Sequence, residues 1–432
     1  MCDTHVLIKN NVVYFAKNSD REPGEAQLVV RIPPESNDKQ KKLKTTYIPI
    51  EQAASRHGVI LSKPFWIWGA EMGVNDQGVV IGNEPIYSRV IDKKRGLIGM
   101  DLLRLGLERG DTAEHAMHVI IELIEQYGQG GICGYRDQRM RYDNSFIIAD
   151  AEQAWILETA GRFWVAKKVV TFGAISNCLT IGEDYDLKSE GLEDKAKQKG
   201  FLKSKGAFSF KKSFDTRFIP FFAASSQRLQ SSQNCLQQTF QGPQINMQQV
   251  MNNLRTHYDQ TASPATGTNR DVCMHAGGFI RRSQTCGSMV SRLWGKNSLH
   301  FCTGTSAPCM SIFKPVSFDF DLDFSVLNAD EKIVDGSLWQ NHEYIHRRLI
   351  FMEKKRHVLQ ESIAQTENEM LSVFEEKEFM PSKDDMIKAD DIVRKWTDRC
   401  FHEYRHHTFH YPSMSLYGMF WKKINAQDGF NF

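Results

Sequence analysis

The fold is decided by the stretch VVYFAKNSDR at residues 12–21, which follows the shorter stretch THVLI at residues 4–8. Both stretches are rich in β-branched and aromatic residues, and the pair Asn10-Asn11 between them is typical of a tight turn. The two stretches therefore predict an antiparallel hairpin at the start of the chain. The second strand ends in polar and charged residues, and the turn brings these residues back beside the first residues of the chain.

The rest of the chain alternates groups of predicted strands with groups of predicted helices. We expect strands at residues 27–32, 65–72, 79–81, 145–150, 154–159, 163–168, 171–176, 287–294 and 298–303, and an exposed loop at 35–44. Apolar residues at helical spacing predict helices within 99–127 (with a break at 109–112), around 247–257, along 337–374 and along 384–406. This order predicts an α+β fold in which helices cover sheets, and the early hairpin favours antiparallel strands.

The composition excludes several classes of protein. The 54 Lys and Arg residues nearly balance the 52 Asp and Glu residues, and the net charge of +2 gives no drive toward nucleic acid or an anionic membrane. The most apolar stretches, such as residues 218–224, fall well short of the roughly 20 apolar residues that a spanning helix needs. Because no signal peptide is expected, the nine scattered cysteines predict reduced thiols and a cytoplasmic protein.

Cys2 follows the initiator methionine and is small enough for Met1 to be removed. The trimmed residue carries a thiol and an α-amine on one carbon. A free α-amine has a pKa of roughly 7.7–8.0, so an appreciable fraction is neutral at physiological pH and can take the thiol proton. Cys2 is therefore a candidate nucleophile that supplies its own base. The alternative is that Cys2 is an incidental small residue in a first strand.

The end of the second predicted strand returns charged residues to the side of Cys2. Asp20 can hold the α-ammonium that forms when the amine takes a proton. Lys17 or Arg21 can lower the pKa of the thiol, because a nearby cation favours the thiolate. The alternative for residues 18–21 is a turn with a surface ion pair.

Short motifs recur in a fixed order along most of the chain. They are MCDT at residues 1–4, FAKNSDR at 15–21, MGVNDQGVVIGNE at 72–84, WILETAG at 155–161, ISNCLTI at 175–181, CMHA at 273–276, SQTCGSMVS at 283–291 and SIFKP at 311–315. In this order the motifs resemble the cysteine N-terminal nucleophile (Ntn) hydrolases, in particular the family that joins bacterial dipeptidase A with the secernins. The similarity is closest to the secernin branch. No single motif is specific, whereas their order along the chain is.

This resemblance implies a four-layer αββα fold, in which two antiparallel sheets lie between helices and Cys2 stands at the end of a strand. The sandwich is expected to occupy residues 1–320. After Pro315 the sequence changes to long amphipathic helical stretches. Residues 321–432 are therefore expected to form a mainly helical extension that packs on the core.

The resemblance also implies roles for particular residues. Asp20 falls where related acylases place an aspartate beside the amine of the nucleophile. Lys17 falls where those acylases carry an arginine near the thiol, and this departure puts its role in doubt because lysine is a point charge without a planar fork. Arg228 is a loose match to a later arginine of the acylases.

Asn83 and Asn177 fall near two positions that supply amide donors in the family. Attack on an amide carbonyl places negative charge on its oxygen, and one fixed amide N–H aimed at that oxygen can lower the barrier by roughly 3–4 kcal/mol. Asn177 ends a predicted strand and Asn83 follows one, so both side chains can be held rigidly. The alternative for each is a turn residue at a strand end, which is the common place for asparagine.

Histidine patterns near the C-terminus offer a different chemistry. The motif His342-Glu343-Tyr344-Ile345-His346 fits H-E-x-x-H, which on a helix can bind zinc with the glutamate as base. No clear third ligand follows it, and Arg347 and Arg348 add positive charge. A second group, with histidines at 402, 406 and 410, is better explained as a solvated or interface face because Pro412 soon ends the helix.

The sequence therefore predicts a cysteine-type peptidase or amidohydrolase that cleaves dipeptides or small acyl-amides without a metal or organic cofactor. Cys2, Asp20, Asn83, Asn177, Lys17, Arg21 and Arg228 are the predicted catalytic residues. A zinc metallopeptidase that uses His342, Glu343 and His346 is an alternative. A further alternative is a secernin-like binding or regulatory protein with weak or lost hydrolase activity. We expect neither nucleic-acid binding nor membrane insertion, and the C-terminal helices could serve a homo-oligomer.

Overall fold

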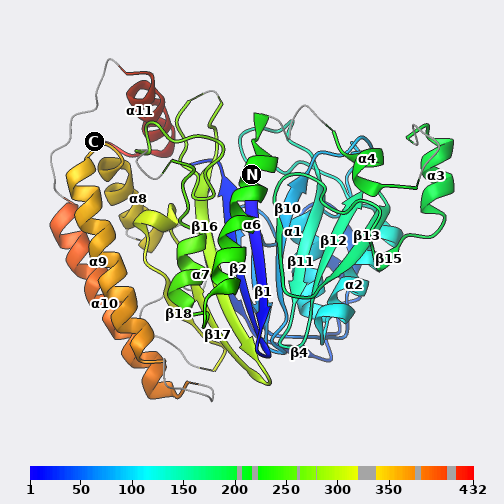
Figure 1. Cartoon of the computed structure of the whole chain (residues 1–432), viewed down its shortest axis with the longest axis horizontal. Helices are drawn as coiled ribbons and strands as arrows, with labels where there is room; N and C mark the ends of the chain where they lie inside the picture. Colours follow the sequence, from blue (N-terminus) through cyan, green and yellow to red (C-terminus); the bar gives the residue numbers. More distant parts are fainter. Residues whose placement is uncertain are drawn as a thin grey trace.

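The computed structural model describes residues 1–201, 207–216, 222–259, 263–278, 280–319, 337–374, 381–405 and 415–432. Two large antiparallel sheets form its centre, and helices lie on their outer faces (Figure 1). The predicted α+β fold with two antiparallel sheets between helices is thus confirmed. No helix among these described residues is both long and apolar enough to cross a lipid bilayer.

The first sheet has six strands and is built around the predicted N-terminal hairpin. Its order is β14 (Phe172–Ile175), β1 (Cys2–Lys9), β2 (Val12–Arg21), β16 (Gln284–Trp294), β17 (Asn297–Cys302) and β18 (Lys314–Val316). Asn10 and Asn11 have φ angles of 54° and 59°, which is the left-handed turn geometry that matches the twist of a hairpin. In the resulting register Cys2 lies opposite Ser19.

The second sheet has eight strands. Its order is β15 (Leu187–Lys188), β13 (Phe163–Val169), β12 (Ala154–Ala160), β11 (Asp143–Ala149), β10 (Val80–Ile86), β9 (Met72–Asn75), β8 (Val59–Pro64) and β3 (Gln27–Ile32). The prediction of a strand at 65–72 is wrong, because residues 65–71 form the connection between β8 and β9. Its Gly69 passes so close to the first turn of the next helix that a Cβ would lie 2.2 Å from the Met100 backbone.

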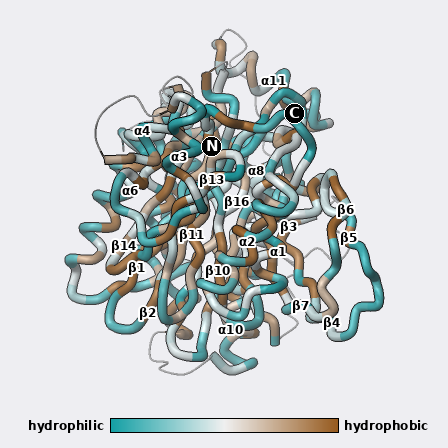
Figure 2. Tube along the Cα trace, turned by 90° about the vertical axis from the view of Figure 1, so that its right-hand side faces the viewer, coloured by the Kyte–Doolittle hydropathy of each residue, from teal (hydrophilic) through white to brown (hydrophobic). Residues whose placement is uncertain are grey.

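The loop expected at residues 35–44 contains two short strands that belong to separate two-stranded ribbons. One ribbon pairs β4 (Glu35–Ser36) with β7 (Ser55–Arg56), and the other pairs β5 (Lys42–Lys44) with β6 (Pro49–Glu51). The connection between β4 and β5 is hydrophilic and lies at the periphery (Figure 2). The short strands are mostly exposed, so the sequence predicted the exposure of these residues correctly and missed their strand pairing.

Helices cover the outer face of each sheet. The predicted pair within 99–127 is confirmed as α1 (Gly99–Arg109) and α2 (Ala113–Tyr127), and the N-cap residue Thr112 accepts a hydrogen bond from the amide of His115. This pair packs on the eight-stranded sheet. The six-stranded sheet is covered by α6 (Ser225–Gln241) and α7 (Met247–Asn253). Shorter helices are α3 (Leu192–Gln198), α4 (Phe210–Phe214) and the 3-10 turn η1 (Pro308–Met310).

The C-terminal helices lie beside the six-stranded sheet (Figure 1). They are α8 (Leu338–Leu349), α9 (Glu353–Ser372), α10 (Lys383–Tyr404) and α11 (Leu416–Asp428), so the single helical stretch expected at 337–374 is divided at residues 350–352. Their buried apolar side chains belong to one cluster with those of β16, β17 and α7, and the ring centroids of Phe301 and Phe374 lie 5.9 Å apart. The boundary predicted between residues 320 and 321 lies outside the described residues, and the division into two domains stays a prediction.

The two sheets approach most closely at Gly82 of β10. A Cβ at this position would lie 2.6 Å from Cδ of Lys17 and 3.0 Å from Cζ of Phe15, and both residues belong to β2 in the opposite sheet. The missing side chain therefore lets the sheets meet and places Lys17 between them.

We predict that Gly82→Ala lowers the free energy of unfolding by about 1–3 kcal/mol, because the added methyl overpacks the space between the sheets. Urea unfolding followed by circular dichroism would measure this change. Gly182→Ala is the matched control, because there a Cβ meets only Oγ of Ser209 at 3.5 Å. Equal effects of the two substitutions would contradict the close approach at Gly82.

Candidate active site around Cys2

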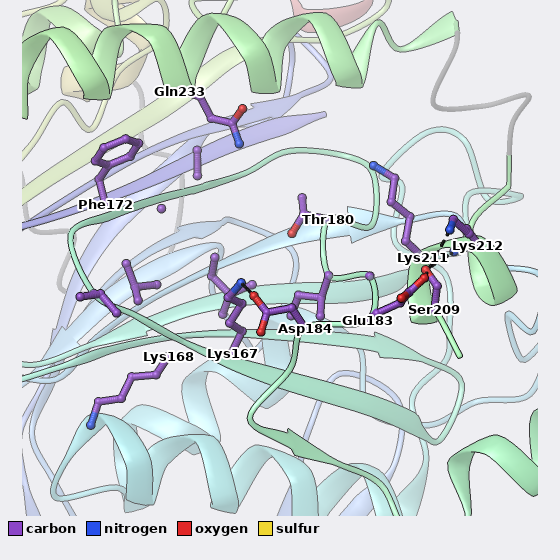
Figure 3. Close-up of a pocket in the computed structure, with 17 residues that line it drawn as sticks. Lys167, Lys168, Phe172, Thr180, Glu183, Asp184, Ser209, Lys211, Lys212 and Gln233 are labelled. Carbon is purple, nitrogen blue, oxygen red and sulfur yellow. Dashed lines mark hydrogen bonds and ion pairs between the residues drawn. The ribbon is translucent and has the colours of Figure 1, made fainter. Parts of the chain in front are cut away.

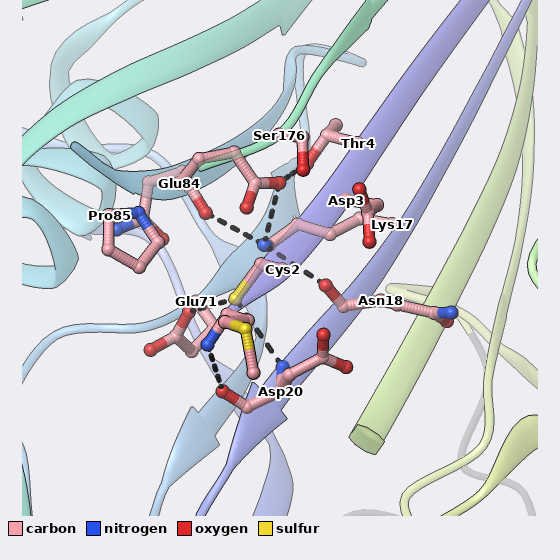
Figure 4. A network of polar contacts seen from close by, with 12 residues as sticks. Cys2, Asp3, Thr4, Lys17, Asn18, Asp20, Glu71, Glu84, Pro85 and Ser176 are labelled. Atoms are coloured by element: carbon pink, nitrogen blue, oxygen red, sulfur yellow. Dashed lines mark hydrogen bonds and ion pairs between the residues drawn. The ribbon is translucent and has the colours of Figure 1, made fainter. Parts of the chain in front are cut away.

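Cys2 begins β1 and is almost completely buried, with 1% of its surface exposed. Side chains alternate along the strand, so Cys2 and Thr4 face the second sheet while Asp3 faces the helices on the other side. The backbone amide of Asp20 donates to Cys2 Sγ at 3.4 Å, and the thiol lies 3.8 Å from Oε2 of Glu71 (Figure 4). The sulfur is thus surrounded by polar groups and not by apolar packing.

Met1 is paired with Asp20 and closes the site. Its N-terminal ammonium donates to the backbone oxygen of Asp20 at 2.9 Å, and the amide of Asp20 donates to the oxygen of Met1, also at 2.9 Å. A cavity of about 30 Å³ beside Cys2 is lined by Met1, Cys2, Asp20, Arg21, Glu22, Glu25, Glu71, Pro85, Tyr87, Gly134, Met140, Tyr142 and Ser283. That volume is about the size of one water molecule, so a chain that retains Met1 has no room for a peptide there.

Asn177 holds the nitrogen of Cys2. The amide nitrogen of Cys2 donates to Oδ1 of Asn177 at 3.0 Å, and the same oxygen accepts from Nη2 of Arg228 at 2.5 Å. The Asn177 amide group donates to the backbone oxygen of Pro85 at 3.1 Å, and Pro85 lines the cavity. The structure therefore fixes Asn177 by its oxygen and holds an N–H of its amide group on Pro85, a residue of the cavity wall.

Arg228 forms a buried ion pair with Asp3 at 2.9 Å, and both side chains are fully buried. Its remaining N–H groups bond Ser176, the backbone oxygen of Asn269 and the backbone oxygen of Ala223. Its bonds to Asp3 and Asn177 link α6 to the first residues of β1. The loose match of Arg228 to a family arginine thus falls on a residue that touches Asn177 and lies 3.5 Å from the sulfur of Met1.

Asp20 lies beside the N-terminal amine. Its Oδ1 accepts from the hydroxyl of Thr285 at 2.6 Å, while no hydrogen-bond donor among the described residues reaches its Oδ2. Burial raises the pKa of Asp20 to about 6, and the charge of the N-terminal ammonium opposes that rise. The carboxylate is therefore ionised at neutral pH, and one oxygen remains for a cation.

Lys17 lies between the two sheets. Figure 4 shows its ammonium between Glu84 and Cys2, and the ammonium bonds Oε1 of Glu84 at 3.3 Å and the backbone oxygen of Asn83 at 2.7 Å. Burial lowers the pKa of Lys17, but the neighbouring acidic groups of Cys2, Glu84 and Glu71 outweigh it and raise the pKa. Glu84 also bonds the hydroxyl of Thr4, and burial raises the pKa of Glu84 while the charge of Lys17 opposes that rise.

The Cys2 thiol is protonated in the chain that carries Met1. Burial raises its pKa, and the charges of Glu84 and Glu71 add to the rise. The charges of Lys17 and the N-terminal ammonium act in the opposite direction and are too weak to reverse it. A base directly beside the sulfur is therefore needed before Cys2 can attack a carbonyl.

Arg21 lines the cavity but is already neutralised. Its guanidinium bonds Glu25 at 2.7 Å, Glu71 at 3.1 Å and the hydroxyl of Tyr142 at 3.3 Å. Glu71 is the residue that joins this group to the thiol. Arg21 therefore orients Glu71 beside Cys2, and its effect on the pKa of the thiol stays a prediction.

Asn83 is not brought to the thiol. It alternates with Glu84 along β10, so its side chain lies on the face of the sheet that α1 covers. There its amide donates to Oδ1 of Asn144 at 3.2 Å and approaches Sδ of Met100 at 3.6 Å. Its backbone oxygen, in contrast, faces the site and holds Lys17.

Sequence reasoning missed the carboxylates Glu71 and Glu84 and the phenol of Tyr142. Glu84 ends the quoted motif at residues 72–84 and Glu71 directly precedes it, so the motif marked their region without revealing their partners. Both glutamates are at most 1% exposed. A buried glutamate needs a partner, but only the folded chain shows that the partners are Lys17 and Arg21.

The H-E-x-x-H motif lies inside the packed core of α8. Glu343 forms an ion pair with Arg347 at 2.6 Å and bonds the hydroxyl of Ser306, while Nε2 of His342 lies 2.8 Å from the backbone oxygen of Ser306. These contacts occupy Glu343 and His342, which are two of the three groups that a zinc peptidase would direct at metal and water. Of the second histidine group, residues 406 and 410 lie outside the described residues.

A larger cavity of about 690 Å³ lies away from this site, beside β13, β14 and α4 (Figure 3). Lysines and carboxylates line it, including Lys167, which pairs with Asp184, and Lys212, which pairs with Glu183. None of the predicted catalytic residues lines this cavity. Size alone therefore does not identify the site.

Comparison with known proteins gives one family match and several structural likenesses. Residues 68–274 match the model of peptidase family C69, a match that includes Glu71, Asn177 and Arg228. Among solved structures, penicillin V acylase from Agrobacterium tumefaciens shares 15% identity at a TM-score of 0.43, over 76% of this chain and 88% of that chain. A mutant of conjugated bile acid hydrolase from Clostridium perfringens shares 12% identity at a TM-score of 0.43, over 70% and 88%.

The family match confirms the predicted class, which is that of an enzyme that hydrolyses amide bonds. The order of the motifs predicted a resemblance to the family of dipeptidase A and the secernins, and the C69 model that matches residues 68–274 is of that type. Cys2 itself precedes the matched residues.

We predict that Arg228→Gln destabilises the fold by about 3–5 kcal/mol, because it leaves the buried carboxylate of Asp3 without its counter-charge. The midpoint of urea unfolding would measure the loss, and adding Asp3→Asn should restore part of it. Arg394→Gln, which breaks the half-exposed pair with Asp391, should leave the midpoint unchanged. Additive effects of the Arg228 and Asp3 substitutions would contradict the pairing.

Proposed function

We propose that the protein, after removal of Met1, is a cysteine-type peptidase that cleaves the amide bond of dipeptides or small acyl-amides with Cys2 as nucleophile. The observation that carries this proposal is the position of Cys2. Its nitrogen is held 3.0 Å from Oδ1 of Asn177, and its sulfur opens on the cavity lined by Asp20 and Glu71. Nucleophile, base and orienting groups thus meet at one residue.

Removal of Met1 would change the site in two ways. The nitrogen of Cys2 would become an α-amine, which is the base that the buried thiol lacks. The space of the Met1 side chain would also join the cavity, and a substrate carbonyl could then approach the sulfur. Retention of Met1 would instead leave the site closed, which favours the alternative of a binding or regulatory protein.

In the proposed reaction the thiol proton moves to the α-amine while Sγ attacks the carbonyl carbon. Asp20 holds the resulting ammonium through Oδ2, which accepts no hydrogen bond from the described part of the chain. An N–H of Asn177 stabilises the negative charge that develops on the carbonyl oxygen. The ammonium then gives its proton to the leaving nitrogen, the C–N bond breaks, and water, deprotonated by the same amine, cleaves the thioester.

Other predicted residues take supporting roles. Lys17 balances the charge of Glu84 and lowers the pKa of the thiol from its place between the sheets. Arg228 fixes the oxygen of Asn177, and Arg21 fixes Glu71. Asn83 donates on the other face of its sheet, so the proposed reaction uses only Asn177 as the side-chain donor to the oxyanion.

The charges of the cavity favour a substrate with a free amine. Its wall carries the carboxylates of Asp20, Glu22, Glu25 and Glu71 and the guanidinium of Arg21, and the N-terminal ammonium also lies there. Arg21 is paired with Glu25 and Glu71, so the wall keeps an excess of negative charge. The α-ammonium of a peptide complements this charge, whereas a neutral acyl group does not.

We predict that Cys2→Ala lowers kcat for dipeptide hydrolysis by at least about 10³-fold, because it removes the attacking sulfur and leaves only binding and oxyanion stabilisation. Steady-state assays on a dipeptide panel would measure this loss after intact mass has shown that Met1 is absent. The half-buried Cys235, which lies outside the site, provides the control Cys235→Ser, and its activity should equal that of the wild type.

Two results would contradict the proposal. The first is unchanged turnover in Cys2→Ala. The second is a natural chain that keeps Met1 in the cell and shows no dipeptidase activity even after the methionine is removed in vitro, which would support the regulatory alternative.

We predict that acetylation of the amine of a dipeptide substrate lowers kcat/KM by at least about tenfold, because it removes the charge that complements the acidic wall. Paired assays of free and N-acetylated dipeptides would measure the ratio. Amidation of the carboxyl end serves as the control and should have the smaller effect. A preference for the acetylated substrate would assign the site to acyl-amides.

A further inference from the structure

Four metal-binding side chains meet in a second cluster, apart from the catalytic residues. They are His257, which follows α7, Cys273 and His275 in the segment that leads to β16, and Cys309 in η1. Each offers one ligand atom, and these four atoms all lie within 4.8 Å of one another. Three of the residues are buried and His257 is partly buried.

The distances within the cluster fit tetrahedral coordination. Nε2 of His257 lies 3.3 Å from Nε2 of His275, and the latter lies 3.3 Å from Sγ of Cys309 and 3.9 Å from Sγ of Cys273. Bonds of about 2.3 Å to sulfur and about 2.0–2.1 Å to nitrogen place ligand atoms roughly 3.3–3.8 Å apart around a tetrahedral zinc ion. The four atoms therefore need only small shifts to share one ion.

The ring nitrogens of the two histidines face each other. Their rings are stacked with centroids 5.3 Å apart and an interplanar angle of 19°. At most one proton can lie between two such nitrogens, whereas a metal ion uses the lone pairs of both. Two thiols and two imidazoles are also the ligand set of structural zinc sites and are unsuited to magnesium or calcium.

We propose that His257, Cys273, His275 and Cys309 bind a zinc ion that holds three segments of the chain together. The site is structural, because four protein ligands close the coordination shell and leave no position for water or substrate. The ion would be separate from the hydrolysis, in which Cys2 acts through its own amine.

The zinc site would stabilise the surroundings of Asp20. Met274 stands between two of the ligands, and its backbone pairs with Thr285, with N–O distances of 2.9 Å and 3.0 Å. The hydroxyl of Thr285 in turn donates to Asp20. Asn18, from the same strand as Asp20, bonds the backbone oxygens of Leu254 and Val272 near the other ligands. The ion would thus hold in place the segments around Leu254 and Met274, which contact the end of β2 at Asn18 and, through Thr285, at Asp20.

The ligand spacing explains why the sequence did not reveal this site. Cys273 and His275 are close in sequence, but His257 and Cys309 are contributed by separate segments, and no C-x-x-C or H-x-x-x-H pattern joins them. The more visible H-E-x-x-H motif lies next to the cluster, with the rings of His346 and His275 stacked 6.5 Å apart.

The test uses the full-length chain, purified without a histidine tag from cells grown with zinc. Mass spectrometry of the elements should find close to one zinc per chain, and X-ray absorption should show Zn–S contacts at about 2.3 Å together with Zn–N contacts. Replacement by Co²⁺ should give the absorption bands of tetrahedral thiolate coordination. These measurements on the unmodified chain do not depend on whether a variant folds.

Variants then assign the ligands. Cys273→Ala and Cys309→Ala should each reduce the bound zinc by more than about tenfold and lower the thermal midpoint of the chain. Cys235→Ser is the matched control, because Cys235 lies nearby, against Thr256, but outside the cluster, and it should retain the metal. Cys2→Ala should also retain it, which separates this proposal from that of the catalytic thiol.

The proposal is overturned if the chain carries no zinc and takes up no Co²⁺ with thiolate bands. It is also overturned if X-ray absorption shows only nitrogen and oxygen ligands, or if mass mapping finds Cys273 and Cys309 joined in a disulfide in freshly purified protein.

Discussion

The pairing register of β1 with β2 is the constraint on which the site depends. Cys2 lies opposite Ser19, and this register directs the thiol between the sheets while Asp3 and Asp20 face the helices. A slip of one residue would move every side chain of β1 to the other face. The pair Asn10-Asn11 fixes the register, because both residues adopt the left-handed turn that joins the strands directly.

Two buried ion pairs set the electrostatic environment of the Cys2 sulfur and nitrogen. The ion pairs Lys17–Glu84 and Asp3–Arg228 lie on opposite faces of β1 and are fully enclosed. Such pairs contribute little net stability, because the desolvation of each ion offsets their attraction. They place fixed charges around a sulfur and a nitrogen that water cannot screen. This arrangement has the properties of a preorganised catalytic site and is costly for a protein that needs only a stable core.

The N-terminal residue connects the structure to the proposed activity. Met1 pairs with Asp20, closes the cavity and withholds the amine, so one processing event would supply both base and access. The loop that carries Cys273 and His275 reaches the same aspartate from the other side, through Thr285. Asp20 is thus the point at which the N-terminus and the proposed zinc site meet.

The sequence by itself determined the antiparallel sheets, the helix pair on one of them, the resemblance to a peptidase family and Cys2 as a candidate nucleophile, because these follow from local periodicity and from the order of motifs. Local patterns gave wrong predictions where tertiary packing had the larger effect. The strand predicted at 65–72 is a connection, and the single helical stretch predicted at 337–374 is divided into α8 and α9. Only the tertiary structure decided that Asn83 faces away from the thiol, that Glu71 and Glu84 face it and that four scattered ligands converge. Contacts between sheets and between distant loops depend on register and close packing, and neither is encoded in any single stretch of the chain.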